Sequence, residues 1–178
     1  IKKNNLRLTY IGRIIKRKKL DLIVDSTLDS NVNLTIIGKP FPESSWSKSL
    51  IKKIKFQKHI KYYPELSKEE IIKILDNSDI FIMPSINETF GVVYIEAMSR
   101  GLPIIFSKGT GVDNTFSCDV GVSIEHHSIA HIKQAIEKIS NNFYIFSTNA
   151  KNEAKKFNWN KISEKFINIY SKLFTNEK

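Results

Sequence analysis

The feature that most constrains the fold of this chain is a regular alternation of short β-branched runs with longer stretches of helical character. The runs predicted to form strands cover residues 6–11, 32–38, 59–63, 79–85, 103–107 and 120–124. The stretches predicted to form helices lie near residues 18–29, 45–57, 67–77, 90–100, 127–140, 145–156 and 159–174. Because the strands are nearly continuous in apolar residues, we expect them to be buried on both faces. The alternation predicts an α/β fold with a doubly wound, Rossmann-like parallel sheet of about six strands.

Local signals mark two of the predicted helix ends. Ser67 and Glu70 have the spacing of a capping box, which begins the third helix. Gly101, followed by Pro103, ends the fourth helix and precedes the fifth strand. No repeat and no long linker divides the chain, so residues 1–178 are predicted to form one domain that closes with helices.

Composition and length indicate a globular chain. Its 178 residues are 41% hydrophobic and 26% charged, as in a typical folded domain. The longest apolar runs have strand length, well short of the roughly 20 residues that span a membrane. Cys118 is the single cysteine and cannot form an internal disulfide, so we expect a cytoplasmic location. The sequence starts without Met and a core strand begins by Leu6, which suggests a piece of a longer protein with a part missing upstream.

The net charge of +10 indicates an affinity for anions. Nucleic acid, anionic lipid headgroups and phosphorylated ligands are the candidate partners of a basic surface. We favour scattered, solvated lysines as the explanation for most of this charge, since such residues need no partner.

Glycines and polar residues follow directly after the predicted strands. They are Gly12 and Arg13, Gly38 to Pro40, Pro64 to Leu66, Pro84 to Gly91, and Ser107 to Gly111. In a doubly wound sheet, ligands bind outside the carboxyl ends of the strands. The sequence therefore predicts a ligand site along this one edge of the sheet.

The segment PSINETFGVVYIEAMSRGLP, residues 84–103, holds two carboxylates. Glu88 is predicted in the loop before the helix and Glu96 in its second turn. Eight residues of helix advance the chain by roughly 12 Å and rotate it by about 80°, so the two carboxylates are expected to bind different parts of a long ligand. Gly91 lets an anion approach the N–H groups at the helix start. The alternative is a favourable charge near a helix start for Glu88 and a solvated side chain for Glu96.

A basic segment, GRIIKRKK at residues 12–19, follows the first predicted strand. Arg13 is placed to bind a diphosphate with two hydrogen bonds. Lys18 is predicted at the start of the next helix, where a run of cations opposes the helix dipole and favours an anionic ligand. A solvated basic helix start is the alternative. Gly38, after the second strand, is explained as well by a turn as by a ligand.

Two motifs carry a resemblance to a known family. The pattern PS-x-x-E-x-FG-x-x-x-x-EA-M-x-x-G-x-P is matched by Pro84, Ser85, Glu88, Phe90, Gly91, Glu96, Ala97, Met98, Gly101 and Pro103. The earlier pattern G-R-x-x-x-x-K is matched by Gly12, Arg13 and Lys18. Over nearly its whole length, the chain resembles the C-terminal, donor-binding half of the GT-B fold in retaining glycosyltransferases of family 4, also called group 1. It departs from the family at Lys19, where Gly is usual, and after the second and fifth strands.

The resemblance implies a site for a nucleotide diphosphate-sugar, with UDP, GDP or ADP as the nucleotide. The implied catalytic residues are Arg13 and Lys18, which would hold the departing diphosphate, and Glu88, which would contact sugar hydroxyls. Glu96 would bind the ribose. The implied donor-binding residues are Gly12, Gly38, Tyr63, Leu66, Phe90, Gly91, Val92 and Glu96. No metal and no other cofactor is implied, because protein cations and the helix dipole would offset the charge of the leaving group.

The implied activity is retaining transfer of a hexosyl group to a glycan or glycolipid. The family's N-terminal acceptor domain is absent from these residues, so we expect the chain alone to bind donor weakly and to transfer no sugar. That domain is the expected partner of the last helices. Peripheral contact with the inner face of the membrane is a further expectation, and nucleic acid is not an expected partner.

Two other hypotheses stay open. One is a non-catalytic basic α/β module that binds nucleotides or polyanions, motivated by the charge of +10. Its binding of polyanions would weaken with rising salt. The other is a member that keeps the fold and has lost the chemistry, against which the intact Arg13, Lys18, Glu88 and Glu96 argue.

Overall fold

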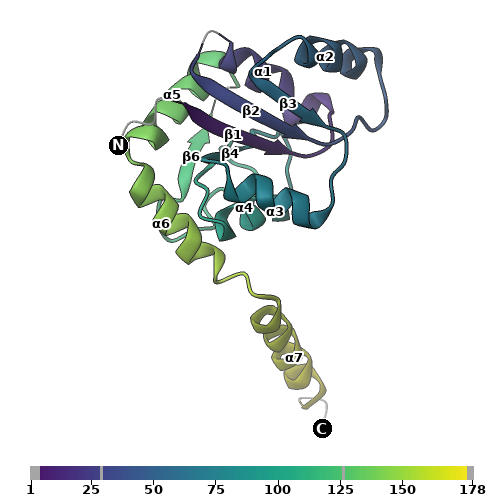
Figure 1. Ribbon diagram of the computed structural model, residues 1–178. Coiled ribbons are helices and arrows are strands. Elements are labelled where there is room, and N and C mark those ends of the chain that lie inside the picture. Colours follow the sequence, from purple (N-terminus) through teal and green to yellow (C-terminus); the bar gives the residue numbers. More distant parts are fainter. Residues whose placement is uncertain (1–4, 29, 126, 176–178) are drawn as a thin grey trace.

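The computed structural model describes residues 5–28, 30–125 and 127–175 of the chain. Within these ranges, one sheet of six parallel strands has the order β3-β2-β1-β4-β5-β6 (Figure 1). The strands are β1 (Leu6–Ile11), β2 (Val32–Ile37), β3 (Ile60–Tyr63), β4 (Ile80–Ile82), β5 (Ile104–Ser107) and β6 (Gly121–Ile124). The helices are α1 (Leu20–Thr27), α2 (Ser45–Lys55), α3 (Lys68–Asp76), α4 (Val92–Ser99), α5 (Ile129–Asn141), α6 (Phe143–Ala154) and α7 (Trp159–Thr175). The predicted doubly wound α/β fold is confirmed.

Helices cover both faces of the sheet. Helices α1 and α2 lie on one face, and α3 and α4 lie on the other (Figure 1). The central strands β4 and β5 are buried along their whole length, as predicted. The ring of Phe81 in β4 packs edge-on against Tyr94 of α4, with 5.6 Å between ring centroids. The core therefore fixes β4 to the helix that follows it.

Strands β1, β2 and β3 differ from the prediction because one of their faces is only partly covered. Leu8 and Leu34 are buried, whereas Arg7, Asn33 and Lys61 alternate with the apolar positions and line the hollow beneath α3. Thr9 lies on the same face as Arg7 and is buried. Alternation of this kind is typical of strands with one face not fully covered. The prediction of burial on both faces therefore holds for the middle of β1 and the end of β2 and is wrong for the rest of this half of the sheet.

The winding of the sheet reverses between β1 and β4. Strand β1 pairs with β2 on one side and with β4 on the other. Loops that follow two such strands diverge to opposite faces and leave a crevice at the carboxyl edge, where ligands of doubly wound sheets bind. The loops after β1 and β4 are those that hold the two motifs found in the sequence.

The basic segment after β1 does not open a helix, contrary to the prediction. Residues 16–18 form a 3-10 turn, Lys19 follows with a φ of 54°, and α1 begins only at Leu20. The turn is fixed by the loop after β4, because the N–H of Ile86 donates to the carbonyl oxygen of Arg17 at 2.7 Å. Residue 29, the last of the predicted helix near 18–29, lies outside the described residues.

The last two helices differ in their packing. Helix α6 packs against the end of α4, and its Ser147 donates to the carbonyl oxygen of Gly101 at 2.7 Å. Helix α7 extends away from the body of the domain (Figure 1). Large apolar side chains are exposed along it at Trp159, Phe166, Ile167, Ile169, Tyr170, Leu173 and Phe174. Across the described helices, none combines the length and the apolar character that crossing a membrane requires.

A buried carboxylate ties α6 to the segment before β6. Glu153 accepts hydrogen bonds from the Ser117 hydroxyl and from Lys156, both at 2.6 Å. Burial alone would raise the pKa of Glu153, but these hydrogen bonds lower it to about 2. The ionised side chain therefore stabilises the folded state at neutral pH.

Replacing Glu153 with Gln is expected to lower the free energy of unfolding at neutral pH by about 1–2 kcal/mol, because charge-assisted hydrogen bonds are lost. The carboxylate stabilises the fold above its ordinary pKa of 4.5, and this contribution disappears as the pH falls toward about 2. Urea unfolding at several pH values should therefore give a difference between the two proteins that shrinks below pH 4.5. Glu137→Gln, exposed on α5, is the matched control. A difference that persists in acid would contradict the assignment.

Candidate functional site

An ion pair between Lys18 and Glu88 joins the loops after β1 and β4, the two strands between which the sheet reverses its winding. The Nζ of Lys18 donates to the Oε2 of Glu88, and the two side chains are only 9% and 13% exposed. The same Nζ lies 3.3 Å from the Sδ of Met83, just after β4. Two of the three predicted catalytic residues are thus in direct contact, although 70 positions separate them in the sequence.

The charge of Glu88 is set by this environment. Burial alone would raise the pKa of its carboxyl, but the hydrogen bond and charge of Lys18, together with the charge of Arg17, hold the pKa below the ordinary value. Glu88 is therefore ionised at neutral pH and accepts hydrogen bonds only. Nearby, a hydrogen bond from the buried Ser85 hydroxyl adds to the lowering of the pKa of Glu88.

Arg17 belongs to this site, and the sequence did not single it out. Its Nη1 donates to the carbonyl oxygen of Asn87 at 3.0 Å, and its own carbonyl oxygen accepts from the N–H of Ile86. Asn87 has a φ of 54°, so both bonds hold a sharply turned segment just before Glu88. The basic character of residues 16–19 was visible in the sequence, but only the turn geometry distinguishes Arg17 from its neighbours.

The start of α4 faces the same loop. Gly91 precedes the helix with a φ of 81°, and a Cβ at this position would lie 2.7 Å from the ring of Tyr94. The residue therefore has to be glycine for both conformational and steric reasons. The backbone N–H groups of Phe90, Gly91 and Val92 donate no hydrogen bond to the described residues. Such groups can accept an anion.

The loop after β5 also reaches Glu88. The N–H of Gly111 donates to the carbonyl oxygen of Glu88 at 2.8 Å. Tyr94 in turn donates its hydroxyl to the carbonyl oxygen of Met83, which fixes the beginning of the same segment. Loops after β1, β4 and β5 are thus joined by backbone hydrogen bonds around one carboxylate.

Gly12 and Gly38 bring the ends of β1 and β2 into close approach. Gly38 has a φ of 142°, and a Cβ on it would lie 2.0 Å from the carbonyl oxygen of Gly12. This contact explains Gly38 without a ligand. Its predicted donor-binding role, like that of Gly12, stays a proposal.

Arg13 is an exposed cation in the loop after β1. The hydroxyl of Tyr10 donates to the Arg13 carbonyl oxygen at 2.9 Å, which fixes the backbone at this position. Within the ranges that the structure describes, the Arg13 side chain forms no hydrogen bond or ion pair. Burial, followed by the nearby charge of Glu88, raises the pKa of Tyr10, so its hydroxyl stays protonated and keeps this bond.

The other predicted site residues line other hollows or pack against other parts of the domain. Glu96 is exposed and lines a hollow of about 440 Å³ between α3 and α4, and Glu88 does not line this hollow. Tyr63 lines a different hollow beneath α3. The ring of Phe90 packs against Phe157, with 5.7 Å between centroids. The remaining two, Leu66 and Val92, are half-buried and exposed, respectively.

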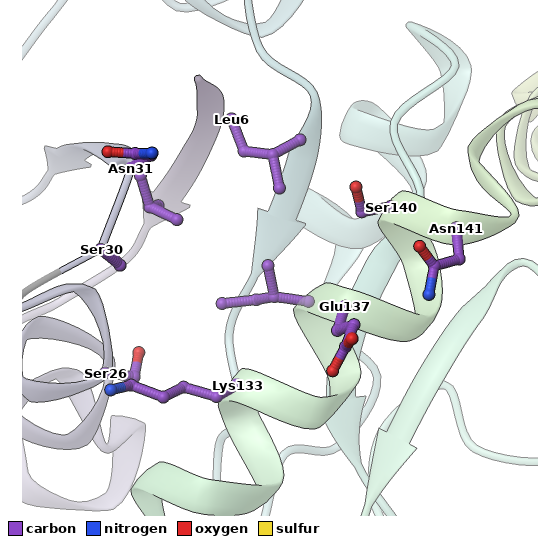
Figure 2. A pocket seen from close by; sticks show the side chains of 10 residues that line it. Leu6, Ser26, Ser30, Asn31, Lys133, Glu137, Ser140 and Asn141 are labelled. Atoms are coloured by element: carbon purple, nitrogen blue, oxygen red, sulfur yellow. The ribbon is translucent and has the colours of Figure 1, made fainter. Parts of the chain in front are cut away.

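Another hollow lies at the opposite edge of the sheet. Its volume is about 350 Å³, and Figure 2 shows Lys133 and Glu137 of α5 opposite Ser26, Ser30 and Asn31. The first residues of β1 and β2 also line it, so it opens at the amino ends of the strands. It contains none of the predicted site residues.

Regarding metals, no group of three or more His, Cys, Asp or Glu side chains in the described ranges could hold an ion.

Curated relatives cover most of the chain at low identity. The capsular polysaccharide biosynthesis glycosyltransferase CapM of Staphylococcus aureus is 28% identical over 170 residues, which are 92% of this chain and 44% of CapM. The D-inositol 3-phosphate glycosyltransferase of Corynebacterium aurimucosum is 23% identical over 176 residues, or 91% of this chain and 42% of that protein. The chain thus spans less than half the length of these relatives.

Solved structures share the fold. The sucrose-phosphate synthase of Thermosynechococcus elongatus matches with a TM-score of 0.82 at 20% identity. The match covers 98% of this chain and 47% of the synthase chain. HepE of Anabaena, in complex with UDP-glucose, matches with a TM-score of 0.82 at 19% identity. The match covers 95% of this chain and 49% of the HepE chain. The C-terminal domain of a group 1 glycosyl transferase from Francisella tularensis, LpcC, has a TM-score of 0.71 at 20% identity and matches over 85% of both chains.

A family model gives the decisive match. The model described as glycosyl transferases group 1 matches residues 1–157, which include both sequence motifs and the Lys18–Glu88 pair. The fold of this region is that of C-terminal GT-B domains. The chain therefore belongs to the glycosyl transferases group 1 family.

Proposed function

We propose that the chain is the donor-binding half of a retaining glycosyltransferase that moves a hexosyl group from a nucleotide diphosphate-sugar to a glycan or glycolipid. The observation that carries this proposal is the buried Lys18–Glu88 ion pair at the crevice between β1 and β4, beside the start of α4. Such a donor carries sugar hydroxyls, phosphate groups and bridging oxygens. The ionised Glu88 can accept hydrogen bonds from the hydroxyls. The Lys18 cation and the available N–H groups at the start of α4 can bind the phosphate and bridging oxygens.

In this proposal the diphosphate binds to positive groups of the protein. Arg13 and Lys18 hold the phosphate oxygens, and the N–H groups of Phe90, Gly91 and Val92 add the partial positive charge of the α4 start. These groups oppose the negative charge that develops on the leaving diphosphate, so the transfer needs no metal and no other cofactor. The position of Arg13 and Lys18 in the same loop after β1, with Lys18 in contact with Glu88, supports this arrangement.

The sugar and the nucleoside bind on either side of the diphosphate. Glu88 accepts hydrogen bonds from sugar hydroxyls, while Glu96 accepts from the ribose hydroxyls. Tyr63 and Leu66 flank the base, and the backbone at Gly12 and Gly38 lines the approach. The separate locations of the two carboxylates favour this division, since Glu88 pairs with Lys18 whereas Glu96 lines a hollow between α3 and α4 that does not include Glu88.

The acceptor binds to another part of the full-length protein. The chain spans less than half the length of its relatives, and the N-terminal acceptor domain is the part proposed to complete the crevice. The exposed apolar side chains of α7 are proposed to pack against that domain. The complete protein then works in the cytoplasm, at the inner face of the membrane when its acceptor is a lipid.

The charge of +10 supports a second candidate, a basic module that binds polyanions without catalysis. The two functions differ in what they bind. The transferase half prefers one nucleotide-sugar, whereas the polyanion module loses affinity with salt and has no nucleotide preference.

UDP-, GDP- and ADP-glucose are the donors with which to test the proposal, beginning with UDP-glucose because the HepE structure contains it. One of them is expected to raise the melting temperature of the chain. Arg13→Gln and Glu96→Ala, both at exposed positions, should weaken that binding about tenfold or more, because each removes a hydrogen bond to or from a charged group. Lys52→Gln on α2 should leave the affinity unchanged. No shift with any donor would overturn the donor-site assignment.

The Lys18–Glu88 pair makes a second prediction, on stability. Lys18→Met should cost about 3–5 kcal/mol of unfolding free energy at pH 7, because it leaves an ionised carboxylate buried without its partner. Since the pKa of Glu88 is lowered in the folded protein, the pair stabilises the folded state at pH values above the ordinary pKa of 4.5. This stabilisation is lost as the pH falls through the pKa of the folded protein. The double variant Lys18→Met with Glu88→Gln should recover most of the loss. Equal instability of both variants in urea unfolding would show that the charge is not the cause.

A further inference from the structure

A basic hollow lies between α3 and the open face of β1, β2 and β3. Its volume is about 580 Å³. Its lining includes Arg7, Thr35, Lys58, Lys61, Tyr63 and Lys73. This lining contains four Lys and Arg side chains and no Asp or Glu.

Most of the positive charge in the basic hollow is not balanced by the protein. Arg7 donates two hydrogen bonds to Asp79, at 3.0 and 3.1 Å, so its charge is compensated. Lys58, Lys61 and Lys73 are exposed, and none of them forms an ion pair with the residues that the structure describes. Three like charges around one concave surface repel each other, and an anion would remove this repulsion.

The sheet residues that line the basic hollow are polar as well. Register pairs Arg7 with Asn33 and Thr35 with Lys61, so these side chains share one face of the sheet. The Thr9 hydroxyl, which is buried on the same face, lies 2.5 Å from the Ser78 hydroxyl and ties the sheet to the segment after α3. The opposite face of the same strands is buried and apolar, which is the usual state of a sheet beneath a helix.

Protection of a sheet edge explains only part of this arrangement. A lysine on an edge strand discourages pairing with another chain, and Lys61 on the edge strand β3 fits that role. Lys58 precedes the strand and Lys73 lies on α3, so neither protects the edge. Three cations that come from different elements and converge on polar sheet residues form the kind of surface that binds phosphate.

We propose that the basic hollow is a binding site for a phosphate group, carried either by an anionic lipid or by a soluble phosphorylated compound. It differs from the proposed donor site, with which it shares Tyr63 alone among the residues assigned to donor binding. The hollow extends along the sheet from Tyr63, at the end of β3, to Arg7, near the start of β1. A ligand there would lie on the flank of the domain and not at its carboxyl edge.

Titration of the ¹⁵N-labelled chain with inorganic phosphate at constant ionic strength tests this proposal. Amide shifts should saturate at residues 58–61 and 73–78. The variant with Lys58, Lys61 and Lys73 all replaced by Gln should bind at least about tenfold more weakly, because the charge-assisted hydrogen bonds are lost. These side chains are exposed, so the fold should survive, and a thermal melt checks it.

A matched control carries the same change in net charge at other positions. Lys52, Lys55 and Lys151 are exposed and do not line the basic hollow, and replacing all three with Gln should leave the phosphate shifts unchanged. Equal weakening in both triple variants would overturn the proposal, because net charge alone would then explain the binding. Shifts confined to residues 12–18 and 84–92 would also overturn it, since those residues belong to the donor site.

Vesicles distinguish the two sources of the phosphate group. Co-sedimentation with phosphatidylcholine vesicles that contain phosphatidylglycerol, reduced by the triple variant of the hollow, would identify a lipid headgroup as the ligand. Phosphate shifts without sedimentation would identify a soluble phosphorylated compound. Binding of the same lipid vesicles by the hollow variant and the control variant alike would contradict a role of the hollow at membranes.

Discussion

The ion pair between Lys18 and Glu88 joins the two halves of the sheet at the point where its winding reverses. Strand β1 supplies the cation through the 3-10 turn that follows it, and β4 supplies the carboxylate through its own loop. Because both side chains are nearly buried, each charge depends on the other to offset the loss of water. The positions of Arg17, Arg13 and the start of α4 all follow from loops that this pair holds together.

The sequence predicted the architecture well because its signals are local. The six strands and seven helices occur where hydrophobic periodicity places them, and the Ser67–Glu70 capping box forms as expected. The contact between Lys18 and Glu88 was not predicted, since no local rule connects residues so far apart and the family motifs implied only separate roles for them. The topology brings the loops after β1 and β4 to one edge, where the contact forms.

Features that depend on packing between elements were not predictable. The basic segment was expected to open a helix, but a hydrogen bond from Ile86 fixes it as a turn. Burial on both faces was expected for every strand, yet β1 to β3 keep a polar face because α3 leaves them partly open. Periodicity says which positions share a face, and it does not say whether a helix covers that face.

Hydrogen bonds between backbones connect the three loops around Glu88, through Ile86 and Arg17 on one side and Gly111 and Glu88 on the other. Movement of the Glu88 backbone would require these bonds to break. The backbone around the carboxylate is consequently in place before any ligand arrives. A ligand that binds here would therefore lose little free energy to ordering these three loops.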